Sequence, residues 1–172
     1  IILADGIIGQ MMEKVVLPPF RPRRTEEEIR KQMPWATQGK LAGHKRNVIT
    51  SLELDPAIME ENNIRFQAKY RKIEEAEVRY EEIGCENADY LMIAFGSMAR
   101  ICLKTQEMAL AEGIKVGVLR PITLWPFPSK IIAEYANKVK GMISVELNAG
   151  QMVEDIRLAV NGKVKVEHFG RL

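Results

Sequence analysis

The sequence predicts an α/β fold for residues 88–172, with an open, mainly parallel sheet and helices on both faces. Short apolar runs typical of buried strands alternate there with amphipathic helical patterns. The links between them are short, and such links favour right-handed crossovers that leave the strands covered on both sides. Strands are expected at 90–96, 114–120, 141–150 and 163–169, and helices at 97–113, 129–141 and 151–162.

Composition excludes several classes of protein. Of the 172 residues, 47% are hydrophobic and 28% are charged, which suits one sizeable core with an appendage. The net charge of +2 is too small to indicate nucleic-acid binding. The sequence also shows neither an apolar run of membrane-spanning length nor a secretion signal, so we expect a cytoplasmic protein that binds neither nucleic acid nor membrane.

Two cysteines are too few for an iron–sulfur cluster or a structural zinc site. We expect Cys85 in the tail of an amphipathic helix and Cys102 on an apolar helix face. The chain by itself is therefore predicted to bind no metal.

Residues 18–54 carry prolines and basic residues without a sustained period, so they are predicted to form a connector. One short helix interrupts it, because Thr25 and Glu28 form a capping box and Pro34 ends the helix. The basic cluster at 21–24 could contact an acidic partner, but a solvated linker is favoured.

A long amphipathic helix is predicted over 55–84. Asp55 is a good N-cap and Pro56 suits the first helical position. Apolar residues recur from Met59 to Ile83 along one stripe, which we expect to face inward. A continuous helix of about 28 residues would be about 42 Å long. The helix either crosses its own core or lies at an interface.

Three loops follow strands at the edge of the sheet where ligands bind in such folds. The first contains Gly96 and Ser97, with Ser97 expected to cap the helix and Arg100 to add positive charge. It is either an anion site or a plain turn. The second is the proline-rich stretch 119–128, in which Trp125 and Phe127 are either rigid interface anchors or packed under their own helix.

The third loop follows Glu146, which is either an acid or base in a cleft or, as favoured, a carboxylate bonded to nearby backbone amides. Neither His44 nor His168 lies in a recognisable catalytic arrangement, so no catalytic residue is assigned. The residues expected to face partners or a ligand are Gly96, Ser97, Arg100, Pro121, Thr123, Trp125, Phe127, Glu146, Asn148 and Gln151.

Three ordered blocks closely resemble the carboxyl-terminal part of the alpha subunit of 2-oxoacid:ferredoxin oxidoreductases. They are "AFGSMARI", "EGIKVGVLRPITLWPFP" and "VELNAGQMVEDIRLAV". The linking segment 51–82 resembles the branched-chain clade, which acts on 2-ketoisovalerate (3-methyl-2-oxobutanoate). "ILADGIIGQMMEKVVLP" resembles the end of the preceding thiamine-pyrimidine-type domain, and "IILAD" at the start looks like the last part of a strand, so we expect a piece of a larger polypeptide.

The resemblance implies that 1–17 is a remnant of that upstream domain and that 88–172 is a transketolase C-terminal-like domain. It also implies oxidative decarboxylation with thiamine diphosphate, Mg and iron–sulfur clusters in the holoenzyme, with ferredoxin and CoA as partners and other subunits in an oligomer. This chain would then assemble subunits and be inactive alone. The alternatives are a 2-oxoglutarate or pyruvate-type oxidoreductase subunit, or a stand-alone α/β domain that binds anions or acts as a scaffold.

Overall fold

The computed structural model describes residues 1–36, 39, 43 and 45–172, and His44 lies outside them. The chain divides into two units, residues 1–11 with 68–172 and residues 12–67.

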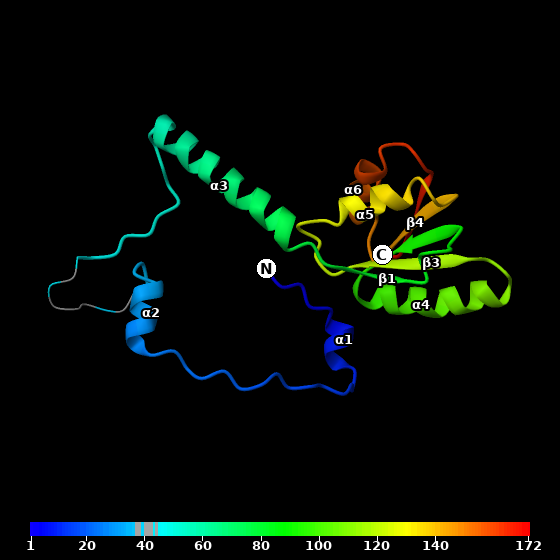
Figure 1. Cartoon of the computed structure of the whole chain (residues 1–172), viewed down its shortest axis with the longest axis horizontal. Coiled ribbons are helices and arrows are strands. Elements are labelled where there is room, and N and C mark those ends of the chain that lie inside the picture. The colour runs from blue at the N-terminus through cyan, green and yellow to red at the C-terminus, as the bar shows by residue number, and fades with distance from the viewer. Residues whose placement is uncertain (37–38, 40–42, 44) are drawn as a thin grey trace. The chain divides into compact units, whose positions relative to one another are not determined.

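The larger unit is built on a five-stranded sheet in the order β1-β3-β2-β4-β5 (Figure 1). The strands are β1 Tyr80–Ile83, β2 Tyr90–Ile93, β3 Val116–Pro121, β4 Gly141–Glu146 and β5 Val166–Gly170. All neighbours pair in parallel except β1, which runs antiparallel to β3. The predicted α/β class, with an open and mainly parallel sheet, is confirmed.

Helices cover the two faces of this sheet, as predicted. Helix α4, Gly96–Ala111, covers one face, and α5, Ser129–Tyr135, and α6, Met152–Val160, cover the other (Figure 1). The core is split accordingly. Cys102 packs with Met92 and Val118 under α4. On the opposite face, the core cluster is formed by Cys85, Leu91, Ile93, Leu119, Ile132, Tyr135, Ala136, Val139, Met142, Met152, Ile156 and Val160.

The prediction that one helix continues to residue 84 is wrong. Helix α3 spans Pro56–Ala76, which is about 31 Å at 1.5 Å per residue. Tyr80–Ile83 is the edge strand β1, with Tyr80 opposite Pro121 and Ile83 opposite Val118. Val78, Tyr80 and Ile83 favour strands, and pairing with the open edge of β3 stabilises that conformation more than about two further helical turns would.

Two further expectations for this region fail. Cys85 lies in the turn after β1, 3% exposed, with its Sγ donating to the Val118 carbonyl at 3.3 Å. No residue of α3 is buried, and Met59, Phe66 and Tyr70 along the predicted inward stripe are exposed. The stripe therefore has no core of its own to cover.

Helices α2 and α3 start at their predicted caps. Asp55 Oδ1 accepts from the Ala57 amide at 2.8 Å at the start of α3. Thr25 and Glu28 form the complete capping box of α2, Glu26–Gln32. The remaining helix, α1, spans Gly6–Gln10 and is capped by Asp5. Among the described residues, no helix is both long and apolar enough to cross a bilayer.

Candidate functional site

The carboxyl ends of β2, β3 and β4 lie at one edge of the sheet because these strands are parallel neighbours. The three predicted loops follow these strands, so the fold brings them to the same edge. Each loop holds its polar groups in a different way.

The first loop binds a carboxylate from the chain itself. The Ser97 amide donates to Asp5 Oδ2 at 3.1 Å, and the Ser97 hydroxyl donates to the same oxygen. The hydroxyl bond, followed by the amide bond, lowers the pKa of Asp5 below its ordinary value. The position that a free anion would take, under the anion-site alternative, is thus filled by Asp5. Sequence reasoning missed this because Asp5 lies 92 residues away from Ser97.

The expected cap of α4 is wrong in detail. The helix begins at Gly96, with Phe95 as the N-cap residue and no side-chain cap hydrogen bond. Gly96 has φ +58°, a conformation that favours glycine, and it turns the chain from β2 into the helix. Ser97 is consequently inside the first turn, and Arg100 follows on the exposed side with its Nη1 3.7 Å from Met11 Sδ.

The favoured interpretation of Glu146 is confirmed. Its carboxylate accepts from the backbone amides of Gln151, Met152 and Val153 at 3.1, 2.9 and 2.9 Å. The Ser144 hydroxyl donates to Oε1 at 2.7 Å. Glu146 is 1% exposed, so it caps the N-terminus of α6 from the buried side of the helix.

The electrostatics of Glu146 follow from these contacts. Burial raises the pKa of the carboxyl, but the hydrogen bonds from Ser144, Met152 and Gln151 outweigh burial, and the pKa lies below its ordinary value. A buried carboxylate that stays ionised and accepts several hydrogen bonds is a structural anchor. It is not arranged as a general base, because its lone pairs are already engaged.

His168 joins this cluster, which the sequence did not reveal. Its Nδ1 is 3.6 Å from Glu146 Oε1 and has no hydrogen-bond partner. The register places it opposite Ser144 on the neighbouring strand, and this parallel pairing is the signal that could have found it. Ser144 is fully buried and donates its proton to Glu146, so the trio lacks an accessible nucleophile.

The rest of the third loop supports the same cap. Asn148 Oδ1 accepts from the Gly150 amide at 2.7 Å, which closes a tight turn before α6. Gln151 is exposed and contributes its backbone amide to Glu146. The loop is therefore ordered around Glu146.

The two aromatic residues of the proline-rich loop, Trp125 and Phe127, differ in their exposure. Phe127 is half-buried and packs against the core cluster under α5, whereas Trp125 is 56% exposed. The Trp125 ring meets Tyr70 edge-on, with centroids 5.6 Å apart. Thr123 Oγ accepts from the Arg79 amide at 3.0 Å, which fixes the loop against the segment leading into β1, while Pro121 is buried.

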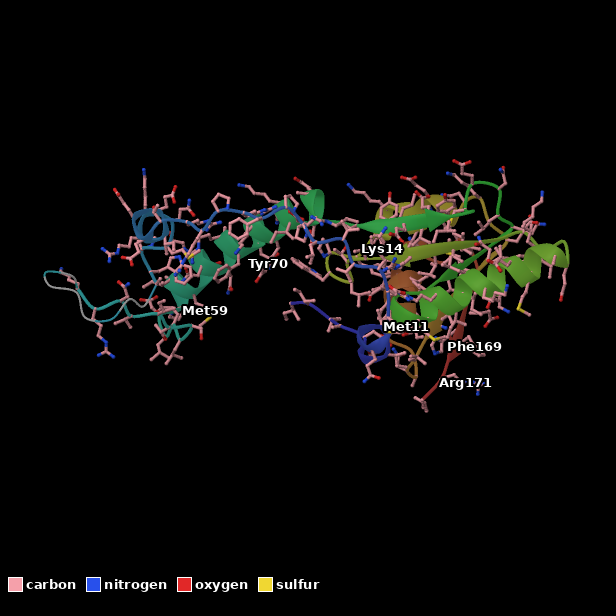
Figure 2. The ribbon with its side chains drawn as sticks, turned by 90° about the horizontal axis from the view of Figure 1, so that it is seen from below. Met11, Lys14, Met59, Tyr70, Phe169 and Arg171 are labelled. Atoms are coloured by element: carbon pink, nitrogen blue, oxygen red, sulfur yellow. The ribbon has the colours of Figure 1, made fainter. Side chains whose placement is uncertain are left out.

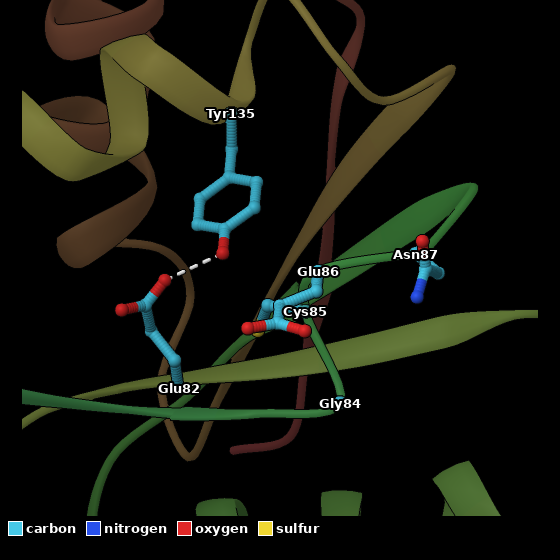
Figure 3. A pocket seen from close by; sticks show the side chains of 6 residues that line it. All are labelled: Glu82, Gly84, Cys85, Glu86, Asn87 and Tyr135. Carbon is cyan, nitrogen blue, oxygen red and sulfur yellow. Dashed lines mark hydrogen bonds between the residues drawn. The ribbon is translucent and has the colours of Figure 1, made fainter.

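An open pocket of about 580 Å³ lies at the opposite end of β1 and has no counterpart among the predicted sites (Figure 3). Tyr135 donates to Glu82 Oε1 at 2.5 Å and so joins α5 to β1. Burial, followed by the Glu82 hydrogen bond, raises the pKa of Tyr135. The lining of this pocket is acidic and polar, and consists of Glu82, Gly84, Cys85, Glu86, Asn87 and Tyr135.

The thiols do not fit an iron–sulfur cluster. Cys85 and Cys102 belong to core clusters on opposite faces of the sheet, and burial raises the pKa of each to about 11. Within the described part of the chain, no group of three or more His, Cys, Asp or Glu residues could hold a metal ion.

Comparison with known families identifies the second half of the chain. Residues 88–172 match the model described as "Pyruvate:ferredoxin oxidoreductase core domain II". In the solved 2-oxoglutarate:ferredoxin oxidoreductase from Magnetococcus marinus, a region is similar to 69% of this chain, which corresponds to 21% of that chain. The identity is 26% and the TM-score 0.59.

Curated relatives match along the whole length of this chain. "Ketoisovalerate oxidoreductase subunit VorB" of Methanothermobacter thermautotrophicus is 45% identical over 172 residues, which are 100% of this chain and 47% of the relative. "2-oxoglutarate synthase subunit KorA" of Archaeoglobus fulgidus is 29% identical over 175 residues, 100% of this chain and 49% of the relative. The chain thus spans about half the length of these relatives. It belongs to the 2-oxoacid:ferredoxin oxidoreductase subunits, and its residues 88–172 match the model of pyruvate:ferredoxin oxidoreductase core domain II.

Proposed function

We propose that the chain is part of the alpha subunit of a thiamine diphosphate-dependent 2-oxoacid:ferredoxin oxidoreductase that acts on 2-ketoisovalerate. The whole enzyme would convert 2-ketoisovalerate and CoA to isobutyryl-CoA and carbon dioxide, with two electrons passed to ferredoxin. The observation that carries the substrate is the 45% identity to the ketoisovalerate subunit over all 172 residues, against 29% to a 2-oxoglutarate subunit.

The cofactors of this proposal would be held outside the described residues. Two buried thiols in separate core clusters do not fit a cluster site, and the carboxylates of Asp5 and Glu146 are engaged by backbone amides. What these residues do is position helices at the carboxyl edge of the sheet. The proposed contribution of this chain is therefore assembly of the enzyme, and not chemistry at a reacting atom.

The substrate is tested on the complete enzyme complex that contains this sequence. We expect kcat/KM for CoA-dependent ferredoxin reduction to be highest with 2-ketoisovalerate, and lower with 2-oxoglutarate and pyruvate. A preference for 2-oxoglutarate or for pyruvate would replace the proposed substrate by that alternative. The 172-residue chain alone is expected to show no turnover with any of the three.

Trp125 is the proposed anchor for another subunit. It is exposed, its ring is held by Tyr70, and it lies in a loop stiffened by three prolines, so docking would cost little conformational entropy. We expect Trp125→Ala to lower the mass of the complex measured by light scattering, while Trp35→Ala, which removes another exposed tryptophan, leaves it unchanged. An unchanged mass with Trp125→Ala would remove the loop from the interface.

The two stand-alone alternatives make different predictions. An anion-binding domain needs a free position at Ser97, and Asp5 already occupies it, which weighs against this function. A scaffold would form a stable dimer from the 172-residue chain without other subunits. Light scattering of the purified chain separates this outcome from the proposed subunit role.

A further inference from the structure

One carboxylate serves the N-termini of two helices that are far apart in the sequence. Asp5 Oδ1 accepts from the Ile7 amide at 2.9 Å and caps α1. Asp5 Oδ2 accepts from the Ser97 amide at 3.1 Å and from the Ser97 hydroxyl in the first turn of α4. The two oxygens of one side chain thus join the N-terminal segment to the core domain.

Both helix ends need such a partner. The first amides of a helix have no acceptor within the helix, and the helix dipole places partial positive charge there. A negative charge shared by two N-termini is stabilised by both. Asp5 carries this charge at neutral pH, and its hydrogen bonds lower its pKa further below the ordinary value of 3.8.

The surroundings of Asp5 are fitted to it. A Cβ at Gly96 would come within 3.3 Å of Asp5 Oδ2, so the absence of a side chain at Gly96 leaves room for the carboxylate. At the far end of α1, Met11 Sδ lies 3.7 Å from Arg100 Nη1, one turn further along α4. Figure 2 shows Met11 beside the start of α4. Segment 1–11 therefore contacts α4 at two points.

We propose that Asp5 is a latch that fastens segment 1–11 to the first turn of α4 at the carboxyl edge of the sheet. Because one side chain holds both helix ends, releasing it frees the α1 cap and the Ser97 amide in the same event. The latch places α1 beside the loop that follows the central strand β2.

The test is amide hydrogen exchange followed by NMR on the full 172-residue chain. In Asp5→Ala we expect the Ser97 and Ile7 amides to exchange faster by about tenfold or more, because each loses its hydrogen bond to the Asp5 carboxylate. The Gly9 amide donates to the backbone carbonyl of residue 5 and should also exchange faster, because α1 frays without its cap. The contact between the Met11 methyl group and the Arg100 side chain should disappear from the NOE spectrum. Amides of β2, such as that of Ile93, should keep their protection and report an intact core.

Asp55→Ala is the matched control, because Asp55 caps α3 through the Ala57 amide and contacts no second helix in the described structure. It should speed exchange at Ala57 and leave Ser97 and Gly9 unchanged. A Ser97 amide that stays as protected in Asp5→Ala as in the original chain would overturn the latch.

Ser97→Ala tests the latch from the other side and leaves the α1 cap atoms in place. Loss of the hydroxyl bond should speed exchange at Gly9 by about threefold, in line with one weakened hydrogen bond. If Gly9 exchange is unaffected, Asp5 is a local cap of α1 and not a latch.

Discussion

Glu146 illustrates how a charged side chain can lie in the core of this fold. Burying an isolated carboxylate is costly, but here three backbone amides and one hydroxyl donate to it at 2.7 to 3.1 Å. The same bonds satisfy amides at the start of α6 that no backbone carbonyl within the helix can reach. The hydrogen bonds therefore offset the cost of burying the carboxylate and, at the same time, satisfy the first amides of α6.

We predict that Glu146→Ala destabilises the chain by about 2–4 kcal/mol, because it leaves buried donors without acceptors. Glu146→Gln should cost less, since its amide oxygen can still accept, although its NH₂ group then faces backbone amides that also donate. The free energy of unfolding from urea titrations would measure both. Glu107→Ala, which removes an exposed partner of Lys104, is the control and should change stability by less than about 1 kcal/mol.

The pH dependence of stability follows from the direction of the Glu146 pKa shift. Because the folded-state pKa lies below the ordinary value of 4.5, the stabilisation from Glu146 is fully present above about pH 4.5 and is lost as the pH falls through the folded-state pKa. The stability difference between the original chain and Glu146→Gln should therefore shrink on acidification from pH 7 into this range. A difference that stays constant down to the acid transition would contradict the assigned ionisation.

At the residue scale, the sequence predicts side chains that act within their own loop. Glu146 is followed within seven residues by the amides it binds, and Asp55, Thr25 and Glu28 act within three residues. Ser97 could not be assigned a partner because Asp5 is brought to it by the tertiary fold. The same holds for His168, which reaches Glu146 across a strand pair.

At the scale of the elements, tight packing between β3 and its neighbours depends on Gly117. A Cβ at this position would lie 2.8 Å from Cys85 Cα and 2.8 Å from Leu91 Cδ2, and the first of these atoms belongs to the backbone. The turn after β1 therefore rests directly on the middle of β3. Gln106 holds the same region from α4, with its Nε2 donating to the carbonyls of Ile83 and Val116 at 2.8 Å.

We predict that Gly117→Ala destabilises the chain by about 1–3 kcal/mol, because the turn or the strand must shift to admit the methyl group. Gly9→Ala is the matched control. It adds the same methyl group to α1, where nothing lies within 4 Å, and should be neutral or slightly stabilising. Thermal unfolding of both variants would measure the contrast, and equal unfolding temperatures would show that the turn yields without cost.

The sequence predicted a single helix over 55–84, but the structure has helix α3 followed by the edge strand β1. Apolar residues in 73–83 occur at spacings that suit a helix, yet Tyr80–Ile83 is a strand because β3 has an open edge for it. The parallel strands were predictable because they are apolar runs bounded by helices. An exposed antiparallel edge strand has no such pattern, and only pairing reveals it.

At the scale of the whole molecule, strand β1 bears on where the independently folding unit begins along the chain. The family match begins at residue 88, but β1 precedes it and pairs with β3. Cys85 is part of the core, and Glu82 holds Tyr135 of α5. We infer that the smallest stable unit begins before β1, near residue 78.

We therefore predict that a chain of residues 78–172 unfolds cooperatively in urea, whereas residues 88–172 are less stable by at least about 3 kcal/mol. The shorter chain loses the ladder between β1 and β3 and the buried Cys85, and β3 becomes an exposed apolar edge that favours aggregation. Both chains share every residue from 88 onward, so the difference reports β1 and its turn alone. Equal urea midpoints, with equal protection of the β3 amides from exchange, would show that the sheet is complete without β1 and that the folding unit coincides with the family match.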